Sequence, residues 1–207
     1  KNRLFMKPSN NLTEGSILRA ITVIGIPTVA TSLLQSSFNL IDMFFVGKLG
    51  PASLAAVTMS GVIVHLLITV AIGISIGTLS LVSRFYGARH FHAAGRVVAQ
   101  AFYLSVFCSI LFGVGGWFLS RPLLGLLGAE GEVLILAVGY FRIISVGAWT
   151  IFIFVTFSSA LRGAGEAWKP FQVMALGVLI NVILDPILIF GLAGFPRLGV
   201  KGSAWAT

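Results

Sequence analysis

The stretch that decides the fold is FQVMALGVLINVILDPILIFGLAGF, residues 171–195, in which Asp185 is the one charged residue. Its apolar length exceeds the roughly 20 residues that an α-helix needs to cross the hydrocarbon core of a bilayer. Because lipid offers no hydrogen-bond partners to the backbone, a single segment can span it only as a helix. The stretch therefore predicts a membrane-spanning helix. It also raises the question of why this helix carries Asp185, followed at once by Pro186.

The rest of the chain has the same apolar character. Hydrophobic residues make up 57% of the 207 residues and charged residues only 10%, whereas a soluble domain typically has about 25% charged residues. A soluble fold would therefore lack the polar side chains for its surface. The chain contains long apolar segments at about 16–47, 52–83, 94–120, 132–161 and 170–193, and a sixth begins at 201–207. We predict an all-α integral membrane protein, a polytopic helical bundle.

The net charge of +8 comes from the connections between these segments, not from a nucleic-acid surface. A nucleic-acid-binding face needs clustered basic residues on a folded surface, and here they flank apolar segments. One side of the membrane would hold Lys1, Arg3, Lys7, Arg19, Arg84, Arg89, Arg96, Arg162 and Lys169. The other side would hold only Lys48, Arg121, Arg197 and Lys201. The excess of basic residues predicts that the N-terminus is cytoplasmic, and no nucleic-acid partner is expected.

Two of the six acidic residues, Asp42 and Asp185, lie within apolar segments, while the other four lie at segment ends or in loops. A carboxylate at the centre of a membrane helix costs about 2.5–3.5 kcal/mol even on the lenient insertion scale. Such an acid is therefore a candidate for function. The alternative is a structural carboxylate that holds two helices together by hydrogen bonds.

The neighbours of these acids favour a functional site. The polar residues of the first segment recur at spacings of 4, 3, 4 and 3, which places them on one helical face: Thr28, Ser32, Gln35, Asn39 and Asp42. In the fifth segment, Asn181 precedes Asp185 by four residues and shares its face. Both acids lie past the midpoint of helices that start on the same side. We therefore expect one shared polar cavity that binds a proton or a cation.

The prolines fit the same interpretation. Pro186 has no N–H, so it leaves the carbonyl of Val182 without its helical partner and favours a bend beside Asp185. Pro27 is a second candidate bend. No nucleophile with a placed base and no cluster of metal ligands can be distinguished, and Cys108 is the single cysteine. An intramembrane enzyme is therefore the less favoured alternative, and neither an enzymatic activity nor a cofactor is expected.

Four stretches carry a resemblance to a known family. They are IPTVATSLLQSSFNLIDMFFVGKLGPASLAAV (26–57), GARHFHAAGR (87–96), ALRGAGEAWKPF (160–171) and NVILDPILIFGLAGFPRLGVKGSAWAT (181–207). In order and spacing they resemble the N-terminal half of the multidrug and toxic compound extrusion (MATE) family, most closely its DinF-like branch. The resemblance implies a twelve-helix transporter of two six-helix lobes. Residues 1–207 would form the N-terminal lobe, with five full helices and the start of the sixth, and its partner would be a C-terminal lobe outside this chain.

The resemblance also implies a function. The family exports organic compounds, here expected to be cationic or amphipathic, in exchange for inward H⁺ or Na⁺ across a bacterial or archaeal cell membrane. Its coupling acids match Asp42 and Asp185, and a Na⁺ ion would bind these two together with Asn181. The family's companion polar residues match Gln35, Asn39 and Asn181, and its helix bend matches Pro27. In the fourth segment, where this branch often has asparagines, the sequence departs from the pattern with Val155 and Ser158, and Ser158 is expected there as a supporting or cavity residue. A lipid or oligosaccharide flippase of the same superfamily is the alternative.

Overall fold

The computed structural model describes residues 17–207, and nearly all of them are helical. The elements are α1 (Ile17–Gly47), α2 (Pro51–Gly87), α3 (Phe91–Leu126), α4 (Gly131–Gly163), α5 (Trp168–Phe190), the 3₁₀ turn η1 (Leu192–Gly194) and α6 (Val200–Ala206). Five of these helices are long and apolar enough to cross a membrane. The predicted polytopic α-helical bundle is thereby confirmed.

Most helices extend beyond their apolar segments. The largest difference is in α3, which runs from Phe91 to Leu126, where the apolar segment predicted 94–120. A helix of 36 residues is ~54 Å long, whereas the hydrocarbon core is only ~30 Å thick. Its ends therefore extend into the polar interface, where charged residues do not terminate it. Conversely, α5 ends at Phe190, before the predicted 193, because Gly191 adopts a left-handed conformation with φ of 74°.

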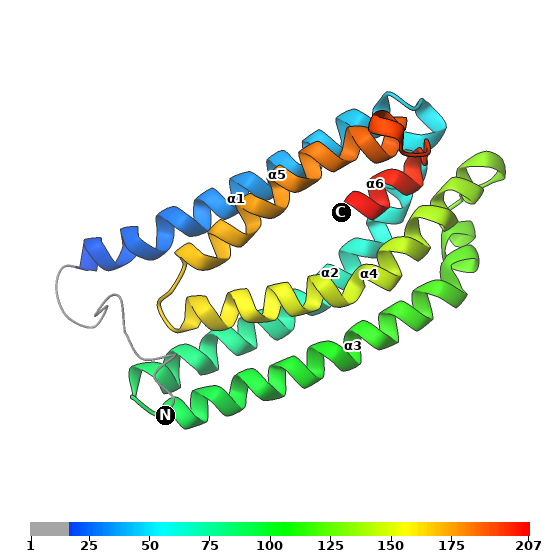
Figure 1. Cartoon of the computed structure of the whole chain (residues 1–207). Coiled ribbons are helices and arrows are strands. Elements are labelled where there is room, and N and C mark those ends of the chain that lie inside the picture. The colour runs from blue at the N-terminus through cyan, green and yellow to red at the C-terminus, as the bar shows by residue number, and fades with distance from the viewer. Residues whose placement is uncertain (1–16) are drawn as a thin grey trace.

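The helices form two groups (Figure 1). In one group, α2, α3 and α4 pack against one another, and in the other α1 and α5 lie side by side. The short helix α6 lies between the groups and contacts both α4 and α5. A buried cluster that includes Val46, Tyr140 and Val200 joins α1, α4 and α6. This cluster lies at the end of the bundle where α1 and α5 finish and α4 and α6 begin.

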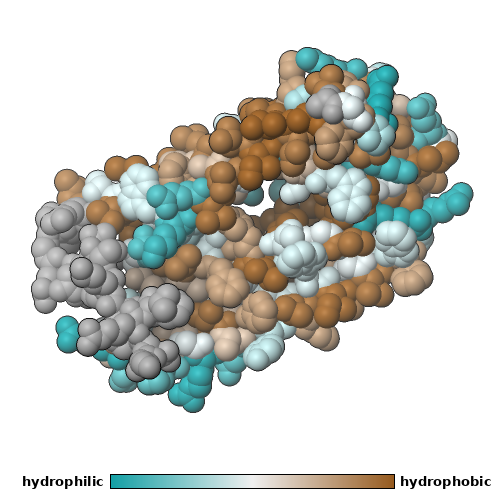
Figure 2. Space-filling model, viewed as in Figure 1, coloured by the Kyte–Doolittle hydropathy of each residue, from teal (hydrophilic) through white to brown (hydrophobic). Residues whose placement is uncertain are grey.

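The exterior is largely apolar, as a surface in contact with lipid should be. Large hydrophobic side chains such as Phe118 and Ile135 are each 74% exposed. Figure 2 shows apolar residues over the length of the helices and hydrophilic residues mainly toward the two ends of the molecule. A soluble protein rarely exposes so much contiguous apolar surface. The faces between the two ends are therefore suited to the hydrocarbon core.

The antiparallel order of the helices separates the basic residues as predicted. Lys48, Arg121 and Arg197 lie near one end of the bundle, and Arg89 and Lys169 lie near the other. The basic residues Lys1, Arg3 and Lys7 lie outside the described residues. Which end faces the cytoplasm stays a prediction.

Candidate functional site

The two acids selected from the sequence lie at the same depth. Asp42 lies five residues before Gly47, the last residue of α1, and Asp185 lies five residues before Phe190, the last of α5. Because α1 and α5 run side by side and end together (Figure 1), the acids come from neighbouring helices at one level. Asp42 is 7% exposed and Asp185 is fully buried. Their charges interact electrostatically.

The hydrogen-bond partner of Asp42 comes from α6. The hydroxyl of Ser203 donates to Oδ1 of Asp42 at 2.5 Å, and Ser203 itself is fully buried. Gly202 makes this possible, because a Cβ at that position would lie 2.5 Å from the carbonyl oxygen of Leu188. Only glycine allows the backbone of α6 to approach α5 so closely. The close contact between two backbones therefore places Ser203 beside Asp42.

The start of α6 is also tied to the end of α5. The last carbonyls of a helix have no intrahelical partner, and here two of them accept from the segment that precedes α6. The amide of Leu198 donates to the carbonyl of Leu188 at 3.1 Å, and that of Gly199 donates to Ile189 at 3.2 Å. These bonds fix the position of Ser203 relative to α5.

Asn181 is the partner of Asp185, as the four-residue spacing predicted. Nδ2 of Asn181 donates to Oδ1 of Asp185 at 3.4 Å. The amide oxygen of Asn181, Oδ1, and the second carboxylate oxygen of Asp185, Oδ2, are both buried and accept no hydrogen bond. A buried polar atom without a partner costs about 1–3 kcal/mol. Two neighbouring residues with such atoms therefore form a natural site for a proton or for a cation that prefers oxygen ligands.

Tyr140 of α4 completes the group. It is buried and lies within electrostatic reach of both Asp42 and Asp185. Neither Tyr140 nor Ser203 is marked as a site residue by any local pattern in the sequence. The order of the helices could have identified these residues. A helix that starts where α1 and α5 end must place its first turns at the depth of the acids.

Other polar residues on the predicted face of α1 do not join this group. Gln35 and Asn39 are exposed, and neither forms a hydrogen bond with Asp42. Ser32 donates to the carbonyl of Thr28 at 3.2 Å, within its own helix. The periodicity correctly placed these residues on one face, but α6 covers that face only near Asp42.

Ser158 is separated from the acids. It lies on α4, 18 residues after Tyr140, which corresponds to ~27 Å along the helix. It is buried near the opposite end of the bundle. Ser158 therefore does not contact Asp42 or Asp185, because α4 runs away from the acids toward Gly163. Its expected role as a supporting or cavity residue stays a prediction.

Both prolines lie inside continuous helices. Pro27 is fully buried within α1, and its carbonyl accepts from the hydroxyl of Thr31 at 2.7 Å. Pro186 directly follows Asp185 within α5, so the carbonyl of Val182 lacks an amide donor at the level of the site. Among the residues described, no three His, Cys, Asp or Glu side chains form a metal-binding group. The oxygen donors at the acids suit H⁺ or a monovalent cation better than a transition metal.

The part of the chain that carries these residues matches a known protein family. Residues 27–187, which include Asp42, Asn181 and Asp185, match the family model described as MatE. The chain belongs to the MatE family. Its relatives include a probable multidrug resistance protein, YoeA, of Bacillus subtilis (strain 168), with 32% identity over 94% of this chain and 42% of the relative. An FAD transporter of Shewanella oneidensis is also 32% identical, over 98% of this chain and 45% of the relative.

Solved MATE structures have the same fold. A multidrug resistance MATE family transporter of the MOP superfamily, solved in an outward-facing conformation, is 34% identical and superposes with a TM-score of 0.88. The match covers 95% of this MatE chain and 43% of that structure. The chain thus spans less than half the length of the relatives that it matches. Its fold is one half of a MATE transporter.

Proposed function

We propose that this MatE chain forms the N-terminal lobe of a secondary active antiporter. The transporter would export small organic compounds, cationic or amphipathic, in exchange for inward H⁺ or Na⁺. The observation that carries the proposal is the buried pair Asp42 and Asp185, with an oxygen of Asp185 and one of Asn181 unpartnered. Relatives named as multidrug resistance proteins support the export of drugs.

In this proposal Asp42 and Asp185 bind the coupling ion, and Asn181 and Ser203 hold them in place. A proton or Na⁺ would remove the repulsion between the two carboxylates. Since Asp42 lies on α1, Asp185 on α5 and Ser203 on α6, the ion would change how these three helices pack. A bend of α1 at Pro27 would transmit that change to the cavity. No enzymatic step is involved.

The exposed residues Gln35 and Asn39 have a separate role in this proposal. They would face the cavity between this lobe and a C-terminal lobe, where transporters with internal repeats bind their substrates. Among the described residues, the polar side chains around the acids are Tyr140, Asn181 and Ser203, none of which is a cation that could hold a phosphate. This favours export of a cation over the flippase alternative. The N-terminus would be cytoplasmic.

Efflux from proteoliposomes tests the proposal. The full-length protein is reconstituted, and vesicles loaded with a fluorescent organic cation are placed in an imposed pH or Na⁺ gradient. FAD is tested in parallel, because one relative is named an FAD transporter. We expect efflux of the organic cation that depends on one of the two gradients. Efflux that is independent of both gradients would contradict antiport.

A further inference from the structure

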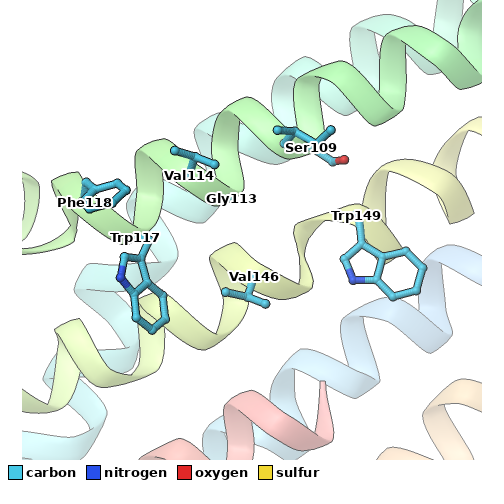
Figure 3. Close-up of a pocket in the computed structure, with 8 residues that line it drawn as sticks. Ser109, Gly113, Val114, Trp117, Phe118, Val146 and Trp149 are labelled. Atoms are coloured by element: carbon cyan, nitrogen blue, oxygen red, sulfur yellow. The ribbon is translucent and has the colours of Figure 1, made fainter.

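A groove on the surface of the bundle has no role in the transport proposal. It lies between α3 and α4, has a volume of about 460 Å³, and is lined almost entirely by apolar side chains. Figure 3 shows Trp117 of α3 and Trp149 of α4 on either side of Val146. All three side chains are exposed by 43% or more. The groove is therefore open at the surface of this chain.

Small residues on α3 create the groove. At Gly113 a Cβ would lie 3.3 Å from the carbonyl oxygen of Ser145, and at Gly116 a Cβ would collide with the Ser145 side chain. The backbones of α3 and α4 therefore approach closely at this level. Since Gly113 has no side chain, the floor of the groove stays open beside Val146. The groove is thus a consequence of helix packing and is built into the sequence.

A cation lies at one end of this groove. Arg142 precedes Val146 by four residues and Trp149 by seven, so all three lie on one face of α4. Nε of Arg142 donates to the carbonyl of Trp117 at 3.2 Å and to the hydroxyl of Ser120 at 3.1 Å. The guanidinium carbon lies 5.0 Å from the centre of the Trp117 ring. These contacts fix the guanidinium at the end of the groove.

The terminal nitrogens of Arg142 remain available. Both of its hydrogen bonds use Nε, and within residues 17–207 no carboxylate forms a salt bridge with it; the ion pair found there joins Lys169 and Glu166. Lys201 adds a second cation nearby, because its alkyl chain packs over Gly139, one turn from Arg142 on α4. The end of the groove is therefore positively charged and unpaired.

The depth of Arg142 matches that of a lipid headgroup. The 33-residue helix α4 is ~50 Å long, so when centred on a ~30 Å hydrocarbon core it extends ~10 Å beyond each face. Arg142 lies eleven residues after Gly131, or ~16 Å along the helix. Its backbone is then only ~6 Å inside the hydrocarbon, and its long side chain can reach the phosphate level.

We propose that this groove binds an anionic phospholipid. The phosphate would accept hydrogen bonds from the terminal nitrogens of Arg142, and one acyl chain would lie along the groove between Trp117 and Trp149. The positive charge at the end of the groove favours an anionic lipid over other ligands. A neutral or zwitterionic lipid leaves the net positive charge of Arg142 and Lys201 unbalanced, and free phosphate leaves the apolar groove unfilled. The site is separate from Asp42 and Asp185, so it does not depend on the transport proposal.

Quenching by brominated lipid tests this site directly. The full-length protein carries Trp168→Phe and Trp205→Phe, two exposed tryptophans, so that Trp117 and Trp149 are the ones retained within the chain described above. Any tryptophan beyond residue 207 is likewise replaced by phenylalanine. The protein is placed in phosphatidylcholine vesicles with a small fraction of chain-brominated phosphatidylglycerol or, in parallel, chain-brominated phosphatidylcholine. We expect the anionic lipid to associate about fivefold more strongly, which corresponds to the ~1 kcal/mol that one basic residue gains from anionic lipid.

Matched variants separate the two parts of the site. With Arg142→Gln, the anionic and the zwitterionic lipid should associate about equally. Arg96→Gln alters an exposed arginine at the other end of α3 and should keep the preference for the anionic lipid. Val146→Phe fills the groove and should weaken quenching by both lipids, whereas Val62→Phe, at 52% exposure on α2, should not. Equal quenching by both lipids in the parent protein would overturn the proposal. So would the absence of quenching, which would mean that protein covers the groove.

Discussion

The acid site and the α3–α4 groove place charge inside membrane helices in opposite ways. Asp42 and Asp185 are buried among α1, α5 and α6, and an oxygen of Asp185 has no partner. Arg142 lies on α4 at the end of the groove, where its Nε donates to Trp117 and Ser120, and its terminal nitrogens form no ion pair within residues 17–207. The acids are thus enclosed by protein, whereas the arginine lies beside an open apolar groove.

The comparison shows what each arrangement is suited to do. A buried carboxylate pair responds strongly to a bound proton or cation, because protein excludes water and repulsion between the two charges is large. A guanidinium held by its nearest helical neighbours gains little from a conformational change. Burial on three helices therefore couples the acids to helix packing, whereas the position of Arg142 on one face suits it to anchor a lipid.

The largest effect on stability should follow from Gly202→Ala. The new Cβ would lie 2.5 Å from the backbone oxygen of Leu188, and a backbone cannot move aside cheaply. We expect a loss of about 3 kcal/mol, measured as a lower thermal unfolding midpoint of the purified protein. Gly77→Ala is the control, because a Cβ there meets nothing within 4 Å, and it should stabilise the helix by about 0.5–1 kcal/mol. Equal midpoints for the two variants would disprove the tight α5–α6 contact.

Removal of the Ser203 hydroxyl should have the next largest effect. Ser203→Ala deletes the donor to Asp42 and should destabilise the protein by about 1.5 kcal/mol, since hydrogen bonds to charged groups contribute about 1.5–3 kcal/mol. Ser203→Thr keeps the hydroxyl and should retain more of the stability and of the gradient-driven efflux. If alanine and threonine behaved alike in both assays, the Ser203–Asp42 bond would have no role.

A smaller effect on stability is expected at the exposed polar residues of α1. Gln35→Ala and Asn39→Ala should each change the free energy of unfolding by no more than about 0.5 kcal/mol, because surface substitutions rarely exceed that. Under the transport proposal they should instead alter the substrate concentration for half-maximal efflux. A large loss of stability would show that these side chains are buried against another part of the protein.

The smallest effect should be that of Ser158→Ala. Ser158 lies ~27 Å along α4 from Tyr140, so its hydroxyl cannot take part in coupling at Asp42 or Asp185. We expect gradient-driven efflux within experimental error of the parent protein. A marked drop would mean that a polar network extends along α4 from the acids.

The sequence predicted the local part of this site and missed the tertiary part. Asn181 and Asp185 are one helical turn apart, so their contact follows from periodicity alone. Ser203 meets Asp42 only because Gly202 lets α6 approach α5, and no local pattern encodes that contact. The long helices were evident from hydropathy, but their ends were not, because helices continue past the hydrocarbon boundary into the interface.

The same limit explains the outcome for Gln35 and Ser158. Helical periodicity identifies the face on which Gln35 lies, but it does not say which part of that face a neighbouring helix covers. The position of Ser158 follows from the antiparallel direction of α4, which places it at the far end from Asp185. The position of a residue along its helix is therefore as informative as the helical face on which it lies. That position can be counted in residues from the nearest predicted turn.

Gradient-driven efflux by Asp42→Asn and Asp185→Asn tests the central claim most directly. Each amide keeps the shape of the side chain but cannot release a proton or carry the charge that attracts Na⁺. The variants are reconstituted beside Glu130→Gln and Glu132→Gln, which alter exposed acids at the α3–α4 turn. We expect both aspartate variants to fall to the rate of empty vesicles while both glutamate variants transport normally. Uphill efflux by both aspartate variants would contradict the account and would make these carboxylates structural.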